Sequence, residues 1–91
     1  MSEKRQILVL AYRDHAEAMR VSAGLTIFGH SVDLVFVDRI VEESDENIAQ
    51  AELLELSGIE PVSLVEDPNL DHIDYTQLNT YLDRAEHVIN L

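Results

Sequence analysis

The chain has 91 residues and a mass of 10.3 kDa, a length that predicts a single domain over residues 1–91 with one core. Its formal net charge of −12 argues against nucleic acid and anionic membranes as partners, because such a surface repels phosphate groups. The chain contains no cysteine, which excludes disulfides, thiolate metal ligands, cysteine nucleophiles and persulfide carriage on this protein.

The first forty residues predict a strand, a capped helix and a second strand. Residues 6–12 are nearly continuously apolar, which is typical of a strand covered on both faces. Asp14 and Glu17 have the spacing of a capping box, and they open a helical stretch that ends at Gly29. The apolar residues 31–37 follow as the next strand. This βαβ unit predicts a parallel sheet.

The rest of the chain continues the alternation. Gly58 is a helix-ending residue, and Asp74 with Gln77 has the spacing of a second capping box. The predicted elements are a helix over 46–56, a strand over 60–65, a turn-rich loop over 66–72, a helix from Asp74 to about Glu86, and a strand over 87–90. The order predicts a small three-layer α/β sandwich, with about four mainly parallel strands and helices on both faces. The predicted core is Ile7, Val9, Leu34, Phe36, Val62, Leu64, Leu78, Leu82 and Ile89.

The first helix has apolar residues on two nearly opposite sides. One side carries Ala18, Val21, Leu25 and Phe28, and the other carries Ala16, Met19, Ala23 and Ile27. A helix on the sheet of a monomer needs only one such side, so the second is covered either by a neighbouring helix or loop or by another subunit. We favour a subunit interface at Ala18, Val21, Leu25 and Phe28, with the opposite set, Met19 and Ile27, as the alternative; either predicts a homo-oligomer.

Several segments resemble the DsrE/DsrF/DsrH-like sulfur-relay proteins. They are Ala16-Glu-Ala-Met-Arg20, Ala23-Gly-Leu25, Phe28-Gly-His30, the strand Val32 to Asp38, and the ending Leu82 to Leu91. The resemblance implies a flavodoxin-like fold that assembles into oligomers. The family's sulfur carriers use a cysteine after a central strand, and this chain lacks it, so no catalytic residue is carried over.

The carboxyl ends of the strands are the expected place for a ligand in an open parallel sheet. This edge predicts a ligand pocket that contains Tyr12, Arg13, His15, Asp38 and Asp67, within the segments Tyr12 to His15, Asp38-Arg39 and Glu66 to Asn69. Arg13 and the following helix N-terminus would suit an anion, and His15 could exchange a proton. Structural roles compete with this hypothesis, because Asp14 is explained as a helix cap and the spaced glycines of phosphate loops are absent.

Other chemistry has little support in the sequence. His15, Asp38, Asp67 and His72 offer metal-binding groups, but their spacing matches no metal motif, so no metal is predicted. No serine lies in the turn motif of serine hydrolases. The sequence therefore predicts no catalytic residue and no cofactor.

These observations leave three classes of function: a non-catalytic partner or scaffold, a binding module, and an enzyme of unknown type. We expect a non-catalytic oligomeric DsrE-like protein that acts as a partner or scaffold subunit in sulfur metabolism. The alternative is a small-molecule or anion-binding module that uses the strand ends. The protein is expected to be cytoplasmic, because its apolar stretches are too short for a signal peptide or a membrane span.

Overall fold

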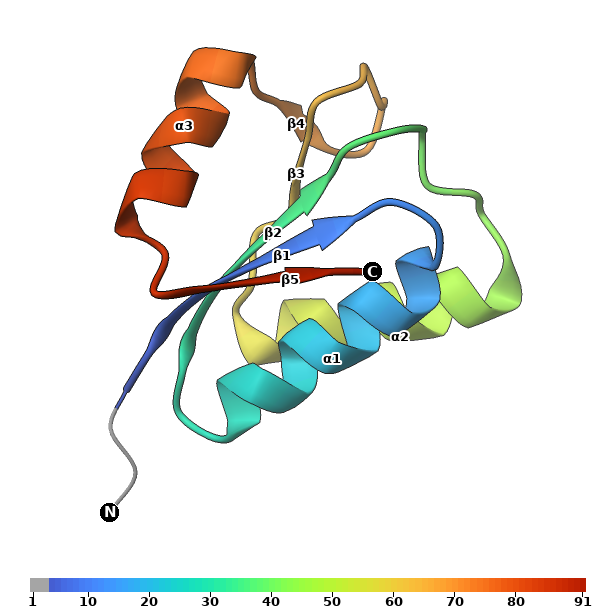
Figure 1. The fold of residues 1–91 in the computed structure, drawn as a ribbon. Coiled ribbons are helices and arrows are strands. Elements are labelled where there is room, and N and C mark those ends of the chain that lie inside the picture. Colours follow the sequence, from blue (N-terminus) through green and yellow to red (C-terminus); the bar gives the residue numbers. More distant parts are fainter. Residues whose placement is uncertain (1–3) are drawn as a thin grey trace.

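A computed structural model describes residues 4–91, so the first three residues of the predicted 1–91 domain lie outside the described part. In this part, five parallel strands form one sheet in the order β4-β3-β2-β1-β5 (Figure 1). The strands are β1 (Gln6–Ala11), β2 (Ser31–Phe36), β3 (Val62–Ser63), β4 (Asp71–His72) and β5 (His87–Asn90), and the helices are α1 (His15–Ile27), α2 (Asp45–Ser57) and α3 (Tyr75–Arg84). Helices α1 and α2 lie on one face of the sheet and α3 lies on the other (Figure 1). The predicted three-layer α/β sandwich is confirmed.

The edge of the sheet differs from the prediction. A short strand, β4, lies within residues 66–72, which the sequence predicted to be a loop, and β3 is much shorter than the predicted 60–65. Pro61 has no N–H to donate on one side of β3. On the other side the Ser63 hydroxyl accepts a hydrogen bond from Val65 N at 3.1 Å, which turns the chain out of the sheet. The sheet therefore has one strand more than the four predicted. The additional strand, β4, lies at the edge and has no alternation of apolar residues that would predict it.

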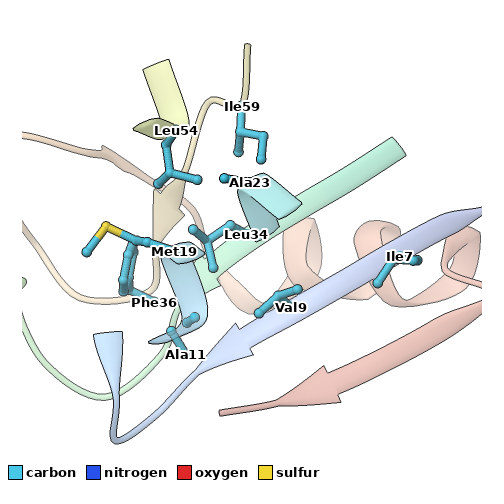
Figure 2. Close-up of a cluster of buried hydrophobic side chains, with 10 residues drawn as sticks. Ile7, Val9, Ala11, Met19, Ala23, Leu34, Phe36, Leu54 and Ile59 are labelled. Carbon is cyan, nitrogen blue, oxygen red and sulfur yellow. The ribbon is translucent and has the colours of Figure 1, made fainter. Parts of the chain in front are cut away.

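The core has two parts because β1 is covered on both faces. Ile7, Val9 and Ala11 point into a cluster between the sheet and α1 and α2 (Figure 2). Leu8 and Leu10 point the other way, into a smaller cluster beneath α3. This two-sided burial explains why β1 reads as a continuous apolar run.

The predicted core is buried in the central strands and only partly buried toward the edges of the sheet and in α3. Ile7, Val9, Leu34 and Phe36 are buried as predicted, whereas Val62, Leu64, Leu78 and Ile89 are only partly buried. Leu82 was predicted to be core but is 37% exposed. The reason is that α3 packs on the sheet through Leu78, Tyr81 and Ala85. The buried face of the helix is therefore centred on Tyr81, and Leu82 lies at its margin.

Helix α2 packs along α1 (Figure 1). Met19 and Ala23, from the other apolar side of α1, share a core cluster with Leu54 of α2 (Figure 2). Ala18, from the predicted interface, is enclosed in the chain's own core and is not available to a partner, and Val21 and Leu25 are partly buried. Phe28 is 77% exposed at the end of the helix, beside the exposed Ile27. Self-association through this end of α1 stays a prediction.

Candidate functional site

The loop after β1 is held in place from two directions. The Arg39 guanidinium donates to the Tyr12 carbonyl at 2.9 Å and to the Arg13 carbonyl at 2.6 Å. From the other side, the Leu91 carbonyl accepts hydrogen bonds from Arg13 N and Asp14 N, both at 3.2 Å. The backbone that carries Arg13 into α1 is therefore fixed by residues from the β2–α2 loop and from the end of β5.

His15 is the buried polar residue at this edge. It is the first residue of α1, is 5% exposed, and packs edge-on against Phe36 with ring centroids 4.8 Å apart. Its Nε2 lies 3.6 Å from Asp38 Oδ1, and within the described residues this buried nitrogen has no hydrogen-bond partner. Burial lowers the pKa of His15, the nearby Arg39 lowers it further, and Asp38 opposes both effects. The ring is therefore neutral at neutral pH.

A polar pocket of about 330 Å³ opens between the first turns of α1 and α2. Its wall includes Arg13, Asp14, His15, Ala16, Arg39, Glu42, Ser44, Glu46 and Asn47. The structure thus brings together Arg13 and His15, two residues of the predicted ligand pocket. Tyr12 and Asp38 lie beside this wall through their contacts with Arg39 and His15.

A larger cavity, which we call the α2 groove, runs along α2 and has a volume of about 780 Å³. Its apolar floor includes Met19, Phe36, Ile48, Ala51, Leu54, Ile59 and Leu70. Met19, Phe36, Leu54 and Ile59 belong to the core cluster drawn in Figure 2, so the floor of the groove is continuous with the core. Its acidic side chains are Glu42, Glu43, Glu55, Glu60, Asp67 and Asp71. Among the described residues that line the groove there is no Lys or Arg.

Asp67 forms part of this groove and not of the polar pocket. Its carboxylate accepts hydrogen bonds from Val41 N at 3.0 Å and from Asn69 N at 2.9 Å, and so joins the loop after β3 to the loop after β2. The predicted pocket is therefore divided: Arg13 and His15 lie at one cavity, and Asp67 and Asn69 lie at the other. Glu42 and Asn47 line both cavities, so the two are neighbours.

The α2 side of the groove was not predicted from the sequence. No ligand role was predicted for the segment between the predicted strand 31–37 and the predicted helix 46–56 beyond Asp38-Arg39, although Glu42 and Glu43 lie on the groove. One signal was available: Ile48, Ala51 and Glu55 follow the i, i+3, i+7 spacing of a single helix face.

Two kinds of feature, a metal-binding cluster and a membrane-spanning helix, are absent from residues 4–91. These residues contain no group of three or more His, Cys, Asp or Glu side chains placed to hold a metal ion. None of their helices is long and apolar enough to cross a membrane.

Comparisons with protein-family models, curated proteins and solved structures gave no match. The resemblance to DsrE-like proteins therefore stays a prediction.

Proposed function

We propose that the protein is a non-catalytic recognition module that binds a basic, amphipathic segment of a partner protein in the α2 groove. The observation that carries this proposal is the combination of an apolar floor with an acidic rim in one cavity. The exposed apolar residues of the floor, Ile48 and Ala51, give a partner something to bury, and a rim of one charge sign selects which partners can approach.

The dimensions of the groove suit a helical or extended segment of a partner. Helix α2 has 13 residues and is therefore about 20 Å long. A partner segment of about four helical turns could lie along it and place apolar side chains at every third or fourth position over the floor. Ile48 is the residue that such a segment would cover, because it is 48% exposed at the groove.

The charge of the groove favours a cationic segment. The rim carries carboxylates such as Glu43, Glu55 and Glu60, and the whole chain has a net charge of −12. A basic partner would be steered toward this surface, and its Lys or Arg side chains would find carboxylates beside the apolar floor.

The described lining of the groove consists of apolar side chains, carboxylates and amides. This composition suits the burial of apolar side chains and the pairing of basic ones.

The family resemblance predicts a role in sulfur metabolism, and such a role would make the partner of the groove a sulfur-metabolism protein. Most of the segments that carry the resemblance lie in α1, β2 and the turn between them. They contribute Met19 and Phe36 to the groove floor, whereas most of the groove comes from α2 and the following loops. The resemblance therefore does not select a partner for the groove, and a sulfur-metabolism protein remains one candidate among basic partners.

The test uses fluorescence anisotropy with labelled synthetic peptides and the full chain. The probe is a Lys/Leu peptide of amphipathic helical pattern, and the controls are a scrambled peptide of equal composition and a peptide with Glu in place of Lys. We expect saturable binding of the first peptide that weakens with salt, and at least about tenfold weaker binding of both controls.

A matched pair of variants tests the location. Ile48→Asp adds a carboxylate to the groove floor and should weaken the probe peptide by about tenfold or more, because it removes apolar contact area. Leu56→Asp makes the same chemical change at another exposed position of α2 that does not line the groove, and it should leave binding unchanged. Equal binding of the scrambled peptide, or equal effects of the two variants, would overturn the proposal.

A further inference from the structure

We propose that the open edge of β5 binds the same edge of a second copy of this chain, antiparallel and about a two-fold axis, and so joins two five-stranded sheets into one. This edge lies at the opposite side of the sheet from β4, whose Asp71 lines the α2 groove. A second copy at β5 would therefore leave the groove open, and failure of either binding event leaves the other unaffected.

The backbone of β5 offers hydrogen-bonding groups on its outer side. In the described part of the chain, β5 lies at the edge of the sheet and pairs with β1 alone (Figure 1). The Leu91 N–H donates to the Leu10 carbonyl at 2.9 Å, and the Leu91 carbonyl accepts from the loop after β1, so both backbone groups of Leu91 point to the β1 side. Successive residues of a strand direct these groups to alternate sides. Ile89 therefore also bonds toward β1, whereas Val88 and Asn90 direct their N–H and C=O groups outward.

The usual protections of an edge strand are missing from β5. Natural edge strands carry Pro, Lys or another charged residue, or they are covered by a helix or a loop. The sequence of β5 is His87-Val-Ile-Asn90, with no Pro, Lys, Arg, Asp or Glu. Val88 pairs with Leu8 and so points to the face of the sheet that carries α3, yet it is 43% exposed. The helix therefore leaves this edge open to another strand.

A two-fold axis at Ile89 matches the hydrogen-bonding groups of two copies. It places Val88 opposite Asn90 of the second copy, and Asn90 opposite Val88, so that the outward N–H and C=O groups of both residues bond reciprocally. Ile89 then lies opposite Ile89 of the second copy in the closely spaced, non-hydrogen-bonded position, where the two side chains can contact each other. The strand is therefore complementary to itself in donors, acceptors and apolar contact.

The charges at the two ends of β5 favour a second copy as the occupant. At the amino end Glu86 pairs with Arg5 at 3.1 Å, and at the carboxyl end Arg13 and Asp14 bond to the Leu91 carbonyl through their backbone N–H groups. Each end therefore carries one arginine and one carboxylate. The two-fold axis brings the amino end of each copy to the carboxyl end of the other, so that Arg13 comes near Glu86 and Asp14 comes near Arg5. Elsewhere a net charge of −12 repels a second copy, most of all at the α2 groove, whose described lining has no Lys or Arg.

Sedimentation velocity of the full chain, from about 1 µM to about 1 mM, measures the association. The contact is small because β5 has four residues, so we expect a reversible dimer with a dissociation constant in the micromolar range. We expect no larger species, since a two-fold contact closes on itself. A monomer over the whole range, or assemblies larger than a dimer, would overturn the proposal.

Two substitutions at Val88 test the outward N–H group. Val88→Pro removes a donor that β1 does not use, and proline is tolerated on the free side of an edge strand, so the dissociation constant should rise by at least about tenfold. Val88→Thr keeps the N–H and the β-branched shape and should change the dissociation constant by less than about threefold. Circular dichroism and the midpoint of thermal unfolding check that both variants are folded. Equal dissociation constants in the two folded variants would refute the role of the edge.

Amide hydrogen exchange of the unmodified chain gives a second test that needs no folded proline variant. The N–H groups of Val88 and Asn90 should become protected only at concentrations where the dimer forms, whereas the N–H of Ile89, which bonds to β1, should be protected at every concentration. Phe28→Asp changes the exposed end of α1, the other surface for which self-association is predicted, and should leave the dimer unchanged. Protection of Val88 and Asn90 that does not depend on concentration, or loss of the dimer in Phe28→Asp, would place the interface away from β5 and overturn the proposal.

Discussion

Leu34→Ala is the perturbation with the best-defined expected cost. Leu34 lies in the middle of β2, beside Val9 in the register of β1, and is 1% exposed. It packs in the cluster with Phe36 between the sheet and the helices (Figure 2). The truncation therefore leaves a cavity with rigid strands on both sides, which cannot collapse easily.

The magnitude follows from the lost carbon atoms and from the cavity. At about 0.8 kcal/mol for each methylene-sized group, the transfer contribution is about 2.4 kcal/mol. The remaining cavity raises the total to about 3–4 kcal/mol. For a domain of this size, each 1 kcal/mol corresponds to about 4–8 °C, so the midpoint of thermal unfolding should fall by about 12–30 °C.

Urea unfolding followed by circular dichroism measures the change in the free energy of unfolding. Leu82→Ala is the matched control, because it removes the same atoms from a side chain that is 37% exposed. We expect the control to lose less than about 1 kcal/mol. Equal losses at Leu34 and Leu82 would refute the burial argument and the position of α3 on the sheet.

Two further predictions concern charged groups. Arg84 donates to the Asp33 carboxylate at 3.0 and 2.7 Å, and the side chain of Asp33 is only 18% exposed, so a double-mutant cycle with Arg84→Met and Asp33→Asn should give a coupling of about 1–2 kcal/mol. A coupling no larger than that of the exposed ion pair within α1 would contradict this expectation. His15 has a pKa below its ordinary value of 6.5 because it is buried, so the unfolded chain binds more protons and the free energy of unfolding should decrease as the pH falls from 7 through 6.5. His15→Phe should flatten this decrease between about pH 7 and 5.5 while His87→Gln keeps it; an unchanged slope in His15→Phe would assign the effect to other groups.

The elements that the sequence predicts well are those with local signals. Asp74 and Gln77 form both halves of the predicted capping box, and Gly58 ends α2 with a φ of +79°. At Asp14 only half of the predicted box forms, because the Glu17 side chain pairs with Arg20 instead. The short strand β4 has no local signal, since its pairing depends on where the loop after β3 returns to the sheet.

The sequence predicts the part of the candidate site whose position follows from the strand order alone. Arg13 and His15 follow β1, so the rule for strand carboxyl ends places them at the correct edge. The α2 groove depends on how α2 packs against α1 and on where the segment from Asp67 to Asp71 lies. The spacing of apolar residues along the sequence does not predict either arrangement. The same limit explains Ala18: periodicity reveals an apolar side but does not say whether the chain's own helix or another copy covers it.

The pairing of β1 with β5 has a consequence for the synthesis of the chain. Ile7 pairs with His87, so β1 leaves the ribosome long before its neighbour on that side exists. Until residues 87–90 emerge, one edge of the most apolar strand has no partner, and an unpaired edge of this kind invites aggregation. The Leu91 carbonyl that holds Arg13 N and Asp14 N arrives later still, after all three helices have been made. A partly synthesised chain would therefore carry α2 before the loop at the polar pocket is held in place.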